Sequence, residues 1–328
     1  MWYFFLALVI VLALLLLGCY GIFRKLIWRQ NPKSKTGWFS RLAHKVIKGG
    51  TDPEGFEEAQ NAAEERLAAL SPERVTLTAP DGATLVAHIL APAVANDRLI
   101  VACHGMGCTG LREFCFLAPD FYEKGYTLLM PDHRGCGESD GNYMGFGTHE
   151  SKDTFLWVQY AKERFPDKKI FLLGVSMGAA TVLMMSRRSG MKDVCGVIAD
   201  CSYTTAWDEF AEQLRASFHL PAFPILHICD FYCRLFCNYS FHSAAPIEAV
   251  KKARKPILFI HGADDLLVPP YMQEQLYEAC SAEKFSIRID GAPHARSYYI
   301  NPDLYTKAVE AFMTQVLRPK TLNIPMED

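Results

Sequence analysis

A serine between two glycines, at the end of an apolar run, is the strongest candidate nucleophile in this chain of 328 residues. The segment Gly174–Gly178 reads GVSMG and fits the pattern Gly-x-Ser-x-Gly, with Ser176 at its centre. The run IFLLGV predicts a buried strand, and the following MGAATVLMM predicts a helix. A sharp strand-to-helix turn needs glycines because the backbone is strongly bent and the two elements pack closely. We therefore expect the Ser176 hydroxyl to stand at an edge of a sheet.

A base and an acid are needed beside this serine, because a hydroxyl is a poor nucleophile until its proton is removed. His294 follows the last predicted strand on a loop with glycine and proline, and we expect it to act as general base and then as general acid. A carboxylate must orient the imidazole and stabilise its charged form. Asp265, after the preceding strand, is our first choice; its neighbour Asp264 and, more remotely, Asp200 are alternatives.

The oxyanion that forms during acyl transfer needs backbone N–H groups that are already in place. One should be the N–H of Met177, at the start of the helix that follows the serine. The second should come from the loop Cys103–Gly107, where we choose the N–H of Met106 and expect His104 to shape the loop. The side chains of both methionines either line an acyl pocket or pack in the core.

Apolar segments of strand length alternate with helical patterns through most of the chain. This alternation predicts a mostly parallel sheet covered on both faces, with its chemistry at the carboxyl ends of the strands. A hairpin precedes it, with strands at 74–79 and 83–91. The later strands are expected at 98–105, 126–135, 169–176, 194–202, 255–262 and 285–290, and the helices at 111–124, 147–165, 177–189, 270–281 and 303–317.

The alternation stops at residues 203–247, between the sixth and seventh predicted strands. This stretch is rich in aromatic residues and contains Pro221, Pro224 and Pro246. We interpret it as a helical lid over the site. Its aromatic side chains either line a pocket or only pack the insertion onto the body.

The first 23 residues carry no charged side chain, and as a helix they would extend over about 35 Å, enough to cross a hydrocarbon core of about 30 Å. No basic residue precedes them, so the basic start of a cleavable signal peptide is missing. Basic residues follow from Arg24 to Lys48, with no acid before Asp52, which predicts an uncleaved anchor with the body in the cytoplasm. Alternatively, Leu16–Cys19 resembles a lipoprotein cleavage box, which would place a lipid on Cys19 and the body outside.

Three regions follow from these patterns: a transmembrane anchor at 1–23, a basic linker and surface helix at 24–72, and a catalytic domain at 73–328. Residues 24–50 are either a surface segment attracted to anionic lipids or a solvated linker. The acidic, alanine-rich stretch 52–70 predicts a surface helix that begins at Asp52-Pro53.

Composition argues against several other classes of protein. Lys and Arg total 34 and Asp and Glu total 36, a balance that disfavours a nucleic-acid binder. The eleven cysteines include no Cys-x-x-Cys pair and are expected to be small buried residues in a reducing compartment. Cys229, Cys233 and Cys237 would share one helix face, but a structural zinc site normally has four ligands. We expect neither a metal nor an organic cofactor.

The set Gly174–Gly178, Asp265 and His294, in the order Ser, Asp, His, resembles the α/β-hydrolase superfamily. The resemblance extends over residues 74–318. His104–Gly107 is similar to the oxyanion loop of that family, and Asp132–Ser139 is similar to its D-x-R-G-x-G-x-S turn.

Within that turn, Asp132 and Arg134 are expected to be structural. The anchor and the lid look closest to membrane-anchored bacterial hydrolases of unassigned substrate. The resemblance implies a serine hydrolase that cleaves carboxylic esters, lipid-like esters among them, through an acyl-enzyme. A peptidase or acyltransferase with the same three residues, and a non-catalytic binding protein that retains the fold, are the alternatives. The oligomeric state is not predicted.

Overall fold

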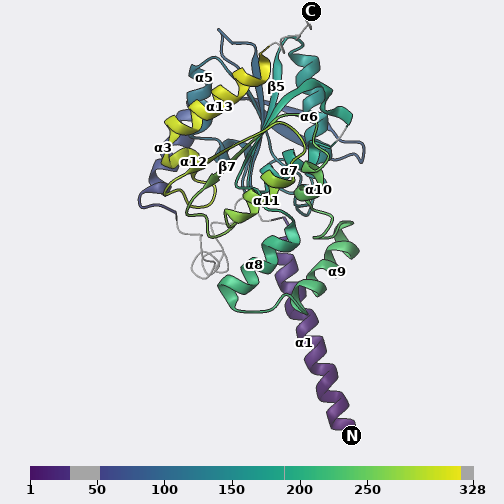
Figure 1. Ribbon diagram of the computed structural model, residues 1–328. Coiled ribbons are helices and arrows are strands. Elements are labelled where there is room, and N and C mark those ends of the chain that lie inside the picture. Colours follow the sequence, from purple (N-terminus) through teal and green to yellow (C-terminus); the bar gives the residue numbers. More distant parts are fainter. Residues whose placement is uncertain (30–51, 188, 319–328) are drawn as a thin grey trace, which may run out of the picture.

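An eight-stranded sheet forms the centre of the protein. The computed structural model describes residues 1–29, 52–187 and 189–318, and Figure 1 shows their arrangement. The first two strands form an antiparallel hairpin whose second strand pairs antiparallel with the fourth, and all later pairs are parallel. In spatial order the strands are β1 (Glu73–Thr78), β2 (Thr84–Leu90), β4 (Thr127–Pro131), β3 (Arg98–Cys103), β5 (Lys169–Val175), β6 (Val194–Asp200), β7 (Ile257–Gly262) and β8 (Lys284–Ile289).

Helices cover both faces of the sheet, which confirms the predicted α/β-hydrolase architecture. Because both faces are covered, β3, β5 and β7 are buried along almost their whole length. One face packs against α6 (Glu150–Arg164), α7 (Met177–Met185), α10 (Pro246–Val250) and α11 (Tyr271–Ala279), and the other against α3 (Phe56–Ala69), α5 (Leu117–Glu123), α12 (Ser297–Ile300) and α13 (Pro302–Leu317).

Three helix predictions were wrong in their bounds, one of them being the helix expected at 177–189, which ends at Met185. The helix expected at 111–124 is split into α4 (Gly110–Glu113) and α5, because the chain between them turns inward and buries Phe114 and Cys115. The surface helix expected from Asp52 begins instead at Phe56, because Gly55 takes a left-handed conformation with φ 76° and interrupts the helix there.

The insertion between β6 and β7 is helical. It consists mainly of α8 (Ala206–Phe218) and α9 (Ile225–Cys237), followed by α10. Figure 1 shows α8 and α9 at the edge of the body beside the N-terminal helix α1 (Trp2–Leu26), with their connecting loop towards the free end of α1.

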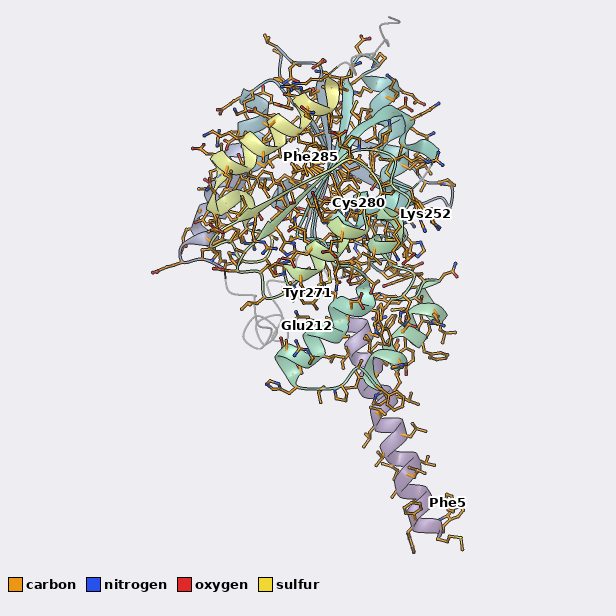
Figure 2. All side chains as sticks on the ribbon, viewed as in Figure 1. Phe5, Glu212, Lys252, Tyr271, Cys280 and Phe285 are labelled. Atoms are coloured by element: carbon orange, nitrogen blue, oxygen red, sulfur yellow. The ribbon has the colours of Figure 1, made fainter. Side chains whose placement is uncertain are left out.

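Helix α1 has a free part and a docked part. Its side chains are exposed through residue 14, and Phe5 stands far from the body in Figure 2. Cys19, Phe23 and Ile27 are buried against the body. Arg29 then donates to the backbone oxygens of Ser139 and Gly137, each at 2.7 Å, which fastens the end of α1 to the body. Most of the basic linker, residues 30–51, lies outside the described part.

Candidate active site

Ser176 occupies a strained turn between β5 and α7. Its φ of 54° and ψ of −117° lie in a region that side chains other than glycine rarely adopt. The two flanking glycines are required by close approach: a Cβ on Gly178 would lie 2.0 Å from the Cys103 oxygen, and one on Gly174 would lie 2.2 Å from the Gly178 oxygen. The N–H of Ser176 donates to the Asp200 backbone oxygen at 2.9 Å and fixes the turn to β6.

The structure brings the predicted base to the predicted nucleophile. His294 Nε2 lies 2.9 Å from the Ser176 hydroxyl oxygen, and His294 Nδ1 lies 2.8 Å from Asp265 Oδ2. The three residues come from loops after β5, β7 and β8, at the carboxyl edge of the parallel sheet, as the positions of the motifs predicted. A proton can therefore pass from the hydroxyl to Nε2 while the carboxylate holds the opposite nitrogen.

Asp265 is buried and held by four N–H groups. Its Oδ1 accepts from the backbone of Leu267 and Val268, and its Oδ2 lies 3.2 Å from His261 Nε2 as well as near His294. Burial alone would raise the pKa of Asp265, but the charge of His294 and the hydrogen bonds from His261 and His294 outweigh it and hold that pKa well below its ordinary range. The carboxylate thus stays ionised beside the imidazole.

The two alternative acids lie elsewhere. Asp200 accepts a hydrogen bond from the Ser297 hydroxyl at 2.9 Å, and Asp264 makes a backbone hydrogen bond to Ala292. His261 was not singled out in the sequence, although it lies in β7, four residues before Asp265.

The predicted oxyanion loop lies directly against the nucleophile. A Cβ on Gly105 would lie 3.4 Å from the Cβ of Ser176. The N–H of Gly105 donates to Glu113 Oε2 at 3.0 Å, and His104 accepts from the N–H of His133 at 2.9 Å. Glu113 thus helps to position the loop, a role that no sequence pattern indicated.

The two proposed donors of the oxyanion site border the same cavity as Ser176. Met177 begins α7, and the first N–H groups of a helix have no partner inside it. Met106 stands in the loop held by Glu113 and is exposed, and both methionines border the cavity, with Met177 also buried in a hydrophobic cluster. Both residues therefore lie beside the cavity that the Ser176 hydroxyl borders.

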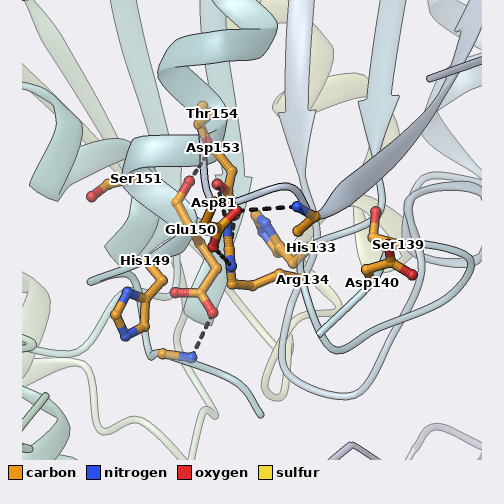
Figure 3. A network of polar contacts seen from close by, with 12 residues as sticks. Asp81, His133, Arg134, Ser139, Asp140, His149, Glu150, Ser151, Asp153 and Thr154 are labelled. Atoms are coloured by element: carbon orange, nitrogen blue, oxygen red, sulfur yellow. Dashed lines mark hydrogen bonds and ion pairs between the residues drawn. The ribbon is translucent and has the colours of Figure 1, made fainter. Parts of the chain in front are cut away.

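The turn Asp132–Ser139 is structural, as predicted. Asp132 accepts from the N–H groups of Gly110 and Glu138, at 2.9 and 2.8 Å. Arg134 pairs with Asp153 and with Asp81 (Figure 3), at shortest distances of 2.6 and 2.8 Å. These contacts join the turn to α6 and to the β1–β2 hairpin, next to the oxyanion loop.

A largely apolar cavity of about 330 Å³ opens beside Ser176. The lid supplies much of its wall, including Phe210, Leu214 and Leu226, so several lid side chains do line a pocket. Helix α1 supplies another part of the wall. The residues of α1 that line the cavity are Ile22, Phe23, Leu26 and, just beyond the helix, Ile27.

Among the described residues, Glu209 is the one that places a carboxyl group in the wall of this cavity. It is buried on α8, and its Oε2 has no hydrogen-bond partner among the described residues. Burial raises the pKa of Glu209 well above its ordinary value, and the nearby charge of Asp265 adds to the shift. Among the described residues the wall includes no Lys, Arg or His, so this part of the cavity suits an uncharged, apolar group.

The cysteines act as packing residues in the described structure. Cys201 Sγ lies within 4.8 Å of ligand atoms of Asp265 and His294, but burial raises the pKa of this thiol well above its ordinary value, so it stays protonated. The three cysteines of α9 form no metal-binding group in the described part; Cys229 contacts the Cys19 oxygen, and Cys233 contacts the Tyr239 hydroxyl.

Comparison with known proteins places the chain in a family. A family model of the alpha/beta hydrolase fold matches residues 98–220. Uncharacterized protein YqkD of Bacillus subtilis is 32% identical over 219 residues, which cover 66% of this chain and 72% of that protein. The chain belongs to the α/β-hydrolase family. Its fold is also similar to an esterase of Pyrococcus furiosus, with a TM-score of 0.61 and 22% identity over 76% of this chain and 93% of that one.

Two further relatives of this α/β hydrolase carry descriptive names. An uncharacterized membrane protein of Saccharomyces cerevisiae is 24% identical over 66% of this chain and 70% of its own length. Lysophosphatidylserine lipase ABHD12 of Danio rerio is 25% identical over 49% of this chain and 41% of its own length. Among the described residues, α1 is the one helix long and apolar enough to cross a membrane.

Proposed function

We propose that this α/β hydrolase is a membrane-anchored serine hydrolase that cleaves carboxylic esters through an acyl-enzyme. The observation that carries the proposal is the unbroken chain of contacts from the Ser176 hydroxyl through His294 to Asp265, at 2.9 and 2.8 Å, on the wall of an apolar cavity. This order of hydroxyl, imidazole and carboxylate is what a serine nucleophile needs.

In the first half of the reaction, His294 Nε2 takes the proton of Ser176 as the hydroxyl oxygen attacks the ester carbon. Asp265 accepts from Nδ1 and stabilises the imidazolium. The negative charge that develops on the carbonyl oxygen is stabilised by the N–H groups of Met106 and Met177. The imidazolium then gives its proton to the leaving alcohol, which departs and leaves the acyl group on Ser176.

In the second half, water takes the place of the alcohol. His294 removes a proton from that water, which attacks the acyl carbon and again places negative charge in the oxyanion site. The imidazolium returns the proton to Ser176, and the carboxylic acid is released. Because the same base serves both halves, its hydrogen bond to Asp265 must persist throughout.

The cavity and the anchor favour an ester with an apolar acyl group. The cavity holds about 330 Å³, a size typical of small-molecule sites, and the described residues of its wall include no cationic side chain that would pair with a phosphate. Two proteins to which the chain is similar are named as an esterase and as a lysophosphatidylserine lipase, and both names describe the cleavage of esters. Helix α1 would hold the enzyme at a lipid surface, with the body proposed to be cytoplasmic.

Labelling with a fluorophosphonate tests the nucleophile directly. The full chain should be labelled, and should hydrolyse p-nitrophenyl esters, whereas Ser176→Ala should lose labelling and more than about 10⁴-fold in kcat. Ser286→Ala, at an exposed serine on β8, is the matched control and should behave as the unaltered chain. Ester turnover by Ser176→Ala would refute the proposal; labelling without turnover of any ester would point to peptidase or acyltransferase chemistry.

Protease digestion of the body in sealed vesicles of known orientation tests on which side of the membrane the body lies.

A further inference from the structure

The free part of α1 is too short to cross a bilayer by itself. Residues 2–14, which are exposed in the described structure, extend over about 20 Å as a helix, whereas a hydrocarbon core is about 30 Å thick. If α1 spans the bilayer, the hydrocarbon must therefore reach roughly residue 21. This level agrees with the charges, because Arg24 is the first charged side chain of the helix and lies 4.2 Å above the Trp28 ring, as expected near headgroups.

At that level α1 is not alone, because α9 packs beside it. The Tyr232 hydroxyl donates to the Leu16 oxygen at 3.1 Å, and the ring centroids of Tyr232 and Tyr20 are 5.5 Å apart. Cys229 contacts the Cys19 oxygen at 3.6 Å. A bilayer thick enough for α1 must therefore meet α9 as well.

The surface that α9 and the loop before it would present to that bilayer is largely apolar, with His219 and His227 also exposed on it. Phe223, Phe231 and Leu235 are 70%, 57% and 60% exposed, and Phe236 is also exposed. The charged pair on α9 is compatible with this position, because Arg234 is bound to Asp230 at 2.8 Å and its long side chain can reach towards the headgroups. Such a cluster of large exposed apolar side chains indicates an interaction surface.

The same region borders the cavity. Leu220, in the α8–α9 loop, lines the cavity and is also exposed, and Ile22 of α1 lines the cavity at the level where the hydrocarbon should end. A substrate that entered the cavity past Leu220 and Ile22 would therefore come from lipid rather than from bulk water.

From these observations, and resting on the anchor and the esterase function proposed above, we infer that the α8–α9 loop and the outer face of α9 are immersed in the bilayer beside α1, and that the cavity takes the acyl ester of a membrane lipid directly from the bilayer. The lid is then a second membrane-binding element. The immersed part of the lid ends on α8 before the ion pair of Glu212 with Arg215, which stays outside the hydrocarbon.

Photo-crosslinking tests the immersion without depending on activity. The full chain, reconstituted in phosphatidylcholine vesicles that contain a phospholipid with a diazirine on its acyl chain, is irradiated and digested, and labelled peptides are identified by mass spectrometry. We expect crosslinks in residues 219–237 as well as in α1. Crosslinks confined to residues 2–14 would overturn the inference, and that result would leave the ester-hydrolase proposal untouched.

Kinetics test the entry of substrate. Phe231→Ser with Leu235→Ser removes two exposed side chains that do not line the cavity, and Val94→Ser with Leu304→Ser is the matched control on exposed apolar residues of the body. We expect the first pair to lower kcat/KM at least fivefold for a long-chain ester in vesicles, with a change below twofold for soluble p-nitrophenyl butyrate. Equal rates for the two pairs on the vesicle substrate would overturn lipid entry at this face. Ser176→Ala tests the proposed function separately, because it should abolish hydrolysis of both the vesicle substrate and the soluble ester.

Discussion

At the scale of single residues, the sequence predicted the side chains that meet at the site but not those that hold them. Ser176, Asp265 and His294 could be found because each follows a strand of a recognisable parallel sheet, and strand ends meet at one edge. Glu113 and His261 could not, because their roles depend on contacts between loops that leave no periodic pattern in the sequence. Their hydrogen bonds set the orientation of groups whose identity was already evident.

Asp265→Asn tests the orienting carboxylate. The backbone donors of Leu267 and Val268 would keep the amide oxygen, so the amide nitrogen would face His294 Nδ1 and favour the wrong tautomer. We expect kcat to fall about 10³- to 10⁴-fold with little change in KM. Asp264→Asn, at the neighbouring acid, is the control and should keep kcat within about twofold. A similar loss in both variants would contradict the assignment of Asp265.

Glu209→Gln tests whether the carboxyl group in the cavity is neutral. Because burial raises the pKa of Glu209 and so favours its protonated form, an amide of the same size should replace it with less than about threefold change in kcat/KM. Glu212→Gln, one helical turn further on α8, is the comparison. A loss above about tenfold in Glu209→Gln alone would show that the ionised form is needed.

At the scale of elements, the sequence indicated the anchor and the lid separately, and the structure joins them. The hydrophobic run of α1 and the aromatic insertion could each be predicted from composition, because each prediction depends only on the residues of that segment. Their contact could not be predicted, because Cys19 and Phe23 look like ordinary anchor residues, and Ile27 like a linker residue, until α9 is placed beside them. The end of the anchor is thereby also a wall of the cavity.

Ile22→Trp tests this wall. The larger side chain would occupy part of the cavity, so we expect kcat/KM for long-chain p-nitrophenyl esters to fall at least tenfold and that for the acetyl ester to change less than threefold. Leu14→Trp, on the free part of α1, is the matched control and should leave the chain-length profile unchanged. Identical profiles for the two variants would mean that α1 does not limit the acyl group.

At the scale of the whole molecule, stability should depend on pH through Asp200, which is buried at the end of β6. Burial raises its pKa to about 7, and the hydrogen bond from Ser297 offsets only part of this shift. In the unfolded chain the pKa is about 3.9. Between these values the unfolded state has lost the proton and the folded state retains it, so this residue makes the folded state less stable as pH rises from about 4 to about 7, with no further change above.

Asp200→Asn should remove that pH dependence while its amide oxygen still accepts from Ser297. Relative to the unaltered chain, we expect the variant to gain about 2 kcal/mol more stability at pH 8 than at pH 5. Thermal unfolding in detergent should show this as a difference in Tm that widens by about 5 °C between the two pH values. A constant difference across the range would show that Asp200 ionises normally in the folded protein.

The docking of the anchor also bears on how the enzyme can be studied. A shortened protein that begins after Arg29, the usual route to a water-soluble sample, would lack one side of its cavity and the fastening of the loop Gly137–Gly141. Inhibitors selected on such a sample would be optimised for a cleft wider than the natural one, and their ranking would change once the full chain was restored.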